Sequence, residues 1–235
     1  MPLTKASRWL VIAVATASLL GCAAHSLDSS VAKNTHRIAL LGPSGSEKYT
    51  IKSLAPAQAG IFLGLAGYVV GKVIEDAVVS DPERQLDSLL KQRNLHITQD
   101  VADATEAALR ERGYEVVRVS VPRADAADEL DVKSDLAPGS DIMVDITLVG
   151  GYSDTAVNGD WGPLIFSLVR AYDSRTQTVL FTTRTGCVIK GATPATQRFA
   201  FQSLSDMLAR PDDAVDGLRA CTKLLGPAIA KLFAS

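Results

Sequence analysis

The amino-terminal segment constrains this chain most, because it separates a targeting signal from the part that has to fold. Lys5 and Arg8 give a basic start, and an unbroken run of apolar and small residues extends from Trp9 to Leu20. A basic start followed by about 7–15 apolar residues is typical of a secretory signal peptide. A membrane-spanning helix needs about 20 apolar residues, so this run is too short to be one. The sequence therefore predicts export.

The end of this run resembles the lipobox of bacterial lipoproteins. In Leu19-Leu20-Gly21-Cys22 a small residue precedes a cysteine, which in that family is acylated and becomes the first mature residue. The resemblance implies a signal peptide at residues 1–21 and three acyl chains on Cys22, where two already suffice for stable anchoring. Ala23 stands where an aspartate would retain such a lipoprotein at the inner membrane, which implies the periplasmic face of the outer membrane. The alternative is an ordinary cysteine beside an ordinary cleavage site.

Composition excludes several classes of protein. The 235 residues are 47% hydrophobic and 21% charged, which is typical of a globular chain and excludes a disordered one. A formal net charge of -2 lacks the basic footprint of a nucleic-acid binder. Three cysteines and three histidines are too few to favour a multi-ligand metal site. We therefore expect no nucleic acid, no metal and no cofactor.

The pattern after Cys22 predicts a short polar tether and one folded domain. Residues 22–35 are small and polar, so we expect a flexible lipidated tether, followed by a periplasmic domain at 36–235. In that domain we expect a strand at 36–41, a turn at 42–45, and a hairpin partner of the first strand at 48–54.

The rest of the domain alternates between helical and strand patterns. Helices are expected from Asp81 to Asn94, from a Thr98 cap to Gly113, and from Pro211 with a kink or break at Gly226-Pro227. Strands are expected at 115–121, 141–149, 164–173 and 177–189, with a solvated loop at 124–136. This order predicts an α/β fold with a mixed, mainly antiparallel sheet and packed helices.

The hairpin in this region also resembles a motif of other envelope proteins. The stretch from Asp173 to Phe181 is similar to the D-x-x-T-G-x-x-L hairpin of outer-membrane accessory lipoproteins, such as the curli-secretion lipoprotein and the penicillin-binding-protein activator. Gln177 stands where those proteins usually have glycine. The resemblance implies a similar fold and says little about function.

A glycine-rich apolar segment at 57–72 allows two interpretations. Its glycines recur at helical intervals, which lets another helix approach closely. They are Gly60, Gly64, Gly67 and Gly71. One interpretation is a glycine zipper that enters a membrane or pairs with another copy. The other, which we favour, is an element packed against the sheet, because an apolar run of about 10–14 residues is more often buried.

The two remaining cysteines are candidates for a disulfide. Cys187 lies in phase with the apolar residues of its strand, and Cys221 lies in the apolar stripe of the last helix. In an oxidising compartment we expect them to bond and join the helix to the sheet. The alternative is two buried thiols that never meet.

No catalytic motif stands out, so we expect no enzyme. Asp141 with Asp145 is most simply a solvated strand face, and the acids at 212–216 an acidic helix start. The loop at 152–162 carries Tyr152 and Trp161, residue types enriched at interfaces, so we name both as candidate partner-binding residues. The alternative for Trp161 is a core position.

The leading functional hypothesis is a lipid-anchored, non-catalytic accessory protein of the outer membrane that binds another envelope protein. The alternative hypothesis is a structural or secretion lipoprotein that oligomerises or inserts into the membrane through the glycine-spaced segment.

Overall fold

The computed structural model describes residues 26–42, 44–45, 49–52, 81–121, 136–154 and 159–234. The predicted signal peptide, Cys22 and the glycines of 57–72 lie outside the described residues, as does most of the predicted loop at 124–136.

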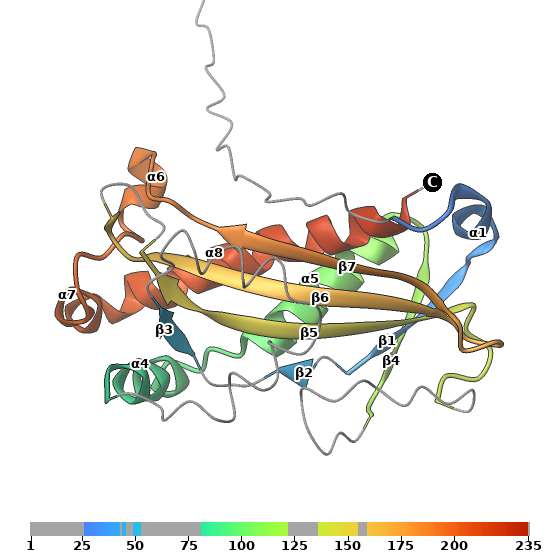
Figure 1. Cartoon of the computed structure of the whole chain (residues 1–235), viewed down its shortest axis with the longest axis horizontal. Coiled ribbons are helices and arrows are strands. Elements are labelled where there is room, and N and C mark those ends of the chain that lie inside the picture. The colour runs from blue at the N-terminus through green and yellow to red at the C-terminus, as the bar shows by residue number, and fades with distance from the viewer. Residues whose placement is uncertain are drawn as a thin grey trace, which may run out of the picture.

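The described residues form a mixed sheet with two long helices on one face (Figure 1). The strand order is β4-β1-β5-β6-β7, and β2 and β3 also pair with β5. The strands are β1 Arg37–Leu41, β2 Ser44–Gly45, β3 Thr50–Lys52, β4 Glu115–Val119, β5 Ile142–Ser153, β6 Gly162–Asp173 and β7 Val179–Val188. The helices are α1 Ser29–Asn34, α4 Asp81–Gln92, α5 Ile97–Glu111, α6 Pro194–Gln197, α7 Leu204–Ala209, α8 Pro211–Ala230 and the short 3-10 helix η2 Lys231–Phe233.

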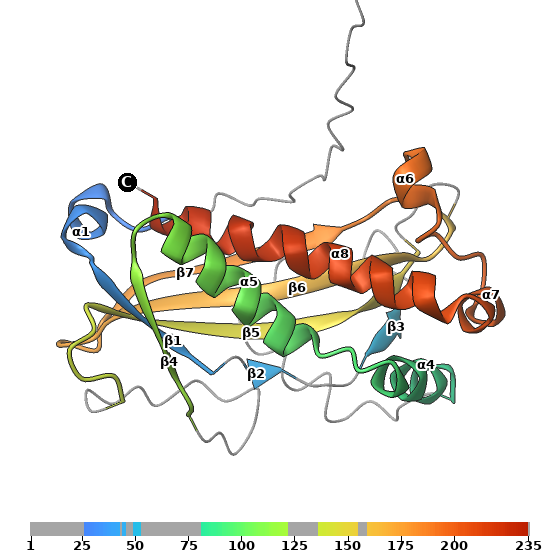
Figure 2. The same cartoon turned by 180° about the vertical axis from the view of Figure 1, so that it is seen from behind.

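The pairing confirms the predicted fold class. The longest strands, β5, β6 and β7, pair antiparallel, whereas β1 pairs parallel with both β4 and β5. Figure 2 shows α5 and α8 crossing the same face of this sheet side by side. The apolar side chains of that face and of the two helices form the main core.

The segments after β1 pair differently from the prediction. We expected a turn at 42–45 and a hairpin partner at 48–54, but β2 and β3 both run parallel to β5. The reason is length, because β5 has 12 residues and β1 only 5. Past Val144 the edge of β5 has no β1 partner, and β2 and β3 continue the direction of β1 along it.

The prediction of a flexible tether at 22–35 is wrong for the second half of that range. Residues 29–34 form helix α1, whose first turn is capped by the Asp28 side chain accepting from the Ser30 N–H. Leu27 is 4% exposed, and its N–H donates to the Leu232 carbonyl at 2.8 Å. Leu27 and Ala32 join the main core, so these two apolar residues hold an otherwise polar stretch to the fold.

The helices match their predictions with two corrections. α5 starts at Ile97, so Thr98 is a buried residue inside the helix and not its cap. Gly113 follows α5 with a φ of +90°, the left-handed conformation expected at a helix end. α8 continues through Gly226 and Pro227 without interruption. A Cβ on Gly226 would lie 2.5 Å from the Ala104 carbonyl carbon, so this glycine lets α8 pack closely on α5.

Candidate functional site

The structure joins Cys187 and Cys221 in a disulfide between β7 and α8. Their Cα atoms are 5.4 Å apart, within the usual range for disulfides. Both residues are buried, and 34 positions separate them in the sequence. The bond joins the last helix to the sheet at the place that strand alternation and the helical stripe predict.

Tyr152 is a core residue, so its prediction as a partner-binding residue is wrong. It lies in β5, is fully buried, and its hydroxyl donates to the Ala214 carbonyl at 2.5 Å. Its ring meets Phe201 edge to face, with centroids 5.4 Å apart. Burial raises the pKa of Tyr152, so the hydroxyl keeps its proton and its hydrogen bond. The sequence pattern ended β5 too early and therefore placed Tyr152 in a loop.

Trp161 lies just before β6, where the chain returns to the sheet. The alternative prediction of a core position is correct for only part of its side chain. Its backbone pairs with Phe201, with N–H to carbonyl distances of 2.7 and 2.9 Å. The side chain is only partly buried and packs against the main core. Residues 155–158 of the predicted contact loop lie outside the described residues.

Two arginines lie over the aromatic residues beside Trp161. The Arg210 guanidinium is 4.4 Å from the ring centroid of Phe201, and that of Arg198 is 4.6 Å from the ring centroid of Phe199. Cation–π contacts of this kind attract the charge to the ring face. Arg210 also donates to the carbonyls of Arg198 and Ala200 at 2.9 and 3.0 Å, which fixes the segment before α7.

Acidic side chains around α7 and α8 pair with these arginines. Arg210 donates to Asp206 at 2.7 Å, and this hydrogen bond lowers the pKa of Asp206. Arg198 lies 3.7 Å from Asp213 and 3.4 Å from Asp216. The acidic start of α8, which the sequence predicts, is therefore part of a charged network.

We call Trp161, Arg198 and Arg210, which lie around the buried rings of Phe199 and Phe201, the arginine–aromatic surface. The Arg198 side chain is 53% exposed and Trp161 is half-buried, so the surface presents guanidinium and indole groups to solvent. Arginine and aromatic residues are enriched at protein interfaces. This is the best candidate contact surface among the described residues. Trp161 was predicted for it from the sequence, whereas the two arginines were missed.

The two acids considered as a pair, Asp141 and Asp145, have different partners, and the prediction of a solvated face is wrong for Asp145. Asp145 is 0% exposed and lies directly across from Arg170 of β6, with 3.7 Å between Oδ2 and Nη1. Asp141 instead accepts from the N–H groups of His36 and Arg37 at 2.8 and 2.9 Å. Desolvation raises the pKa of Asp141, but these backbone hydrogen bonds outweigh it and the net pKa is lowered.

The described residues also show no arrangement typical of a metal site or a membrane-spanning helix. No group of three or more His, Cys, Asp or Glu side chains is arranged there to hold a metal ion. Among the helices in this part of the chain, none combines the length and apolar character needed to cross a membrane.

Comparison with known proteins identifies no family. No family model and no curated protein match the sequence. Among solved structures, a hypothetical protein from Chlamydia trachomatis overlaps with a TM-score of 0.39 at 8% identity, covering 85% of this chain and 98% of the other. A protein from Xanthomonas campestris described as DUF330 gives 0.39 at 12% identity, covering 84% and 85%. Lipoprotein GNA1162 from Neisseria meningitidis gives 0.33 at 14% identity, covering 77% and 98%. Similarity this low says nothing about function.

Proposed function

We propose that this chain is a lipid-anchored, non-catalytic accessory protein on the periplasmic face of the outer membrane, where it binds another envelope protein. The observation that carries the proposal is the buried bond between Cys187 and Cys221. Disulfides persist in the periplasm and are rare in the reducing cytosol. The lipobox-like Leu19–Cys22 indicates export independently of this bond.

The lipid has to supply the membrane attachment under this proposal. Removing residues 1–21 takes away Lys5 and Arg8, which leaves 22 basic against 26 acidic residues. A mildly acidic chain is not drawn to anionic lipid headgroups. Intact-mass analysis of protein from its native host tests the anchor. We expect acyl chains on Cys22, whereas an unmodified cysteine or recovery in the cytosol would contradict the proposal.

The arginine–aromatic surface is the site we propose for the protein partner. A photo-crosslinking amino acid at Arg198 should give a discrete adduct with one envelope protein in living cells. The matched control is the same amino acid at Lys223, which is exposed on α8 away from the aromatic residues. Adducts of equal yield at both positions, or at neither, would exclude this surface as the binding site.

The self-assembling alternative is supported by the spacing of Gly60, Gly64, Gly67 and Gly71. Sizing of the detergent-solubilised protein distinguishes the two functions. A large oligomer that becomes a monomer on deletion of 57–72 would favour self-assembly, whereas a monomer in both forms would favour partner binding.

A further inference from the structure

We propose that one end of the domain lies against the lipid leaflet, and this inference rests on the proposed acylation of Cys22. The membrane-facing end consists of residues 27–34, which include α1, together with η2 and residues 111–114. The occupant of this surface is the lipid bilayer itself. The arginine–aromatic surface, at the opposite end of α8, then faces away from the membrane.

The short chain between Cys22 and Leu27 limits how far the lipid can lie from the folded domain. Leu27 follows Cys22 by only five residues, and five extended residues span at most about 18 Å. Leu27 is itself fixed in the core, with 4% exposure and a hydrogen bond to Leu232. Cys22, to which the acyl chains would be attached, is therefore held within that radius of one defined point on the domain.

That point belongs to a rigid end of the molecule. The Tyr114 hydroxyl, just after α5, donates to the carbonyl of Phe233 in η2. Phe233 is fully buried, and its ring packs on Phe181 with 5.4 Å between centroids. Figure 2 shows α1, the carboxyl terminus and the end of α5 gathered at one end of the molecule. The position of Leu27 therefore sets the orientation of the domain.

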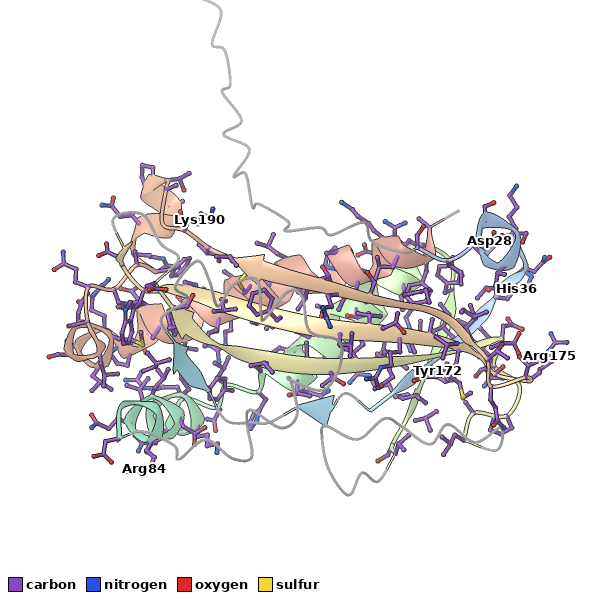
Figure 3. The ribbon with its side chains drawn as sticks, in the orientation of Figure 1. Asp28, His36, Arg84, Tyr172, Arg175 and Lys190 are labelled. Atoms are coloured by element: carbon purple, nitrogen blue, oxygen red, sulfur yellow. A yellow bond between two sulfur atoms is a disulfide. The ribbon has the colours of Figure 1, made fainter. Side chains whose placement is uncertain are left out.

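The length of helix α8 shows how far the opposite end of the domain lies from Leu27. Its 20 residues span about 30 Å, from Ala230 beside η2 to Pro211 beside Arg210. This exceeds the reach of the five-residue connection, so the anchor cannot emerge beside the arginine–aromatic surface. In Figure 3, Asp28 and His36 mark the end at α1, and Lys190 and Arg84 mark the opposite end.

Charge does not decide the orientation. The membrane-facing end exposes the cations Lys33, Arg112 and Lys231, but it also exposes Asp28 and Glu111. One exposed cation contributes about 1 kcal/mol near an anionic leaflet, so the near-balanced set gives little net attraction. The short connection is thus the dominant constraint, and lengthening it should release the domain.

Site-specific fluorescence quenching tests the orientation. Cys187 and Cys221 are bonded and Cys22 would be acylated, so one added cysteine is the only free thiol. A bimane label on Lys33→Cys in α1 is compared with one on Ser205→Cys in α7, both at exposed positions. The lipidated proteins are reconstituted in phosphatidylethanolamine–phosphatidylglycerol vesicles with nitroxide headgroups. We expect quenching several-fold stronger at position 33, and equal quenching or stronger quenching at 205 would overturn the inference.

A longer connection tests the cause, and a mass measurement separates the two proposals. About twenty Gly/Ser residues inserted between Ala24 and His25 add a root-mean-square reach of roughly 25 Å. Quenching at position 33 should then fall toward that at 205, and unchanged quenching would overturn the connection as its cause. The mass of the Cys22 peptide is measured in each sample. An unacylated peptide refutes the proposed function, whereas an acylated protein with the native connection and equal quenching at positions 33 and 205 refutes only the orientation.

Discussion

Gln177 has a left-handed backbone conformation, with a φ of +60°, in the turn between β6 and β7. This conformation costs a residue with a side chain about 1 kcal/mol, whereas glycine adopts it freely. We expect Gln177→Gly to raise the free energy of unfolding by about 0.5–1 kcal/mol, because the greater entropy of the unfolded glycine chain offsets part of the relief. Urea denaturation measures the change. Gln177→Ala should give no gain, and an equal gain from both variants would exclude strain as the cause.

Asp141 makes stability depend on pH through its hydrogen bonds to the start of β1. Its pKa is lowered in the folded state, so its contribution is present above the unfolded pKa of about 3.9 and is lost as pH falls through the folded pKa. Asp141→Asn should therefore cost about 0.5 kcal/mol at pH 7, since solvent screens a partly exposed group. Denaturation midpoints of the two proteins should converge between pH 4 and pH 2. A difference that persists at pH 2 would contradict this role.

The residue roles that the sequence predicted correctly depend on local repetition. Cys187 and Cys221 each lie in a periodic pattern, so the face to which each belongs could be predicted. Tyr152 was misassigned because β5 extends to Ser153, past the point where its alternation is clear. Asp145 was misassigned because its partner Arg170 depends on the strand register, which local pattern does not determine.

The disulfide is the strongest single link between two elements, β7 and α8. Closing a loop across 34 positions stabilises the fold by about 4 kcal/mol in the chain-entropy model. The double variant Cys187→Ala with Cys221→Ala should lose roughly that amount in urea denaturation under oxidising conditions. Adding a reductant should destabilise the native protein by a similar amount and leave the variant unchanged. If the native protein were no less stable in reductant with both cysteines shown to be free thiols, the bond would contribute no stability.

The contact between α8 and α5 depends on the missing side chain at Gly226. A Cβ there would lie 2.5 Å from both the carbonyl carbon and the Cβ of Ala104. We expect Gly226→Ala to lower the free energy of unfolding by about 1–3 kcal/mol, even though alanine favours helix by about 1 kcal/mol over glycine. Adding Ala104→Gly should recover part of this loss. A Gly226→Ala protein more stable than the native one would refute the close packing.

Most helices and strands could be predicted from the sequence, but the partner with which some strands pair could not. The apolar run of β6, the turn that precedes β7 and the apolar stripe of α8 predict both type and approximate bounds. The strand near residue 50 was also predicted, yet its pairing with β5 depends on which strand has an open edge. Such pairing depends on the assembled sheet and leaves no local signal.

At the scale of the whole molecule, the arginine–aromatic surface could not be predicted from the sequence either. Trp161, Arg198 and Arg210 come from three segments that meet only because Phe201 pairs with Trp161 and α8 packs on the sheet. No spacing in the sequence places Arg210 over the ring of Phe201 or brings Trp161 to the same end. A contact surface built in this way can be found only once the chain is folded.

The true start of the domain gives a last prediction. We compare two soluble forms exported to the periplasm, one beginning at Ser26 and one at His36, the boundary predicted from sequence. The longer form should match a form that starts at Cys22 in stability, whereas the shorter should lose about 3 kcal/mol. Burying Leu27 contributes about 1.5–3 kcal/mol, and its hydrogen bond to Leu232 adds about 1 kcal/mol.

Both forms should still unfold in a single transition, because Leu27, Phe233 and the sheet share one core. Leu27→Ala in the longer form is the matched control, and it should reproduce most of the loss without shortening the chain. Chemical denaturation followed by circular dichroism measures all four proteins. If the form beginning at His36 were as stable as the longer one, residues 27–35 would be a tether after all. The end of the domain held near the membrane would then no longer be fixed by Leu27.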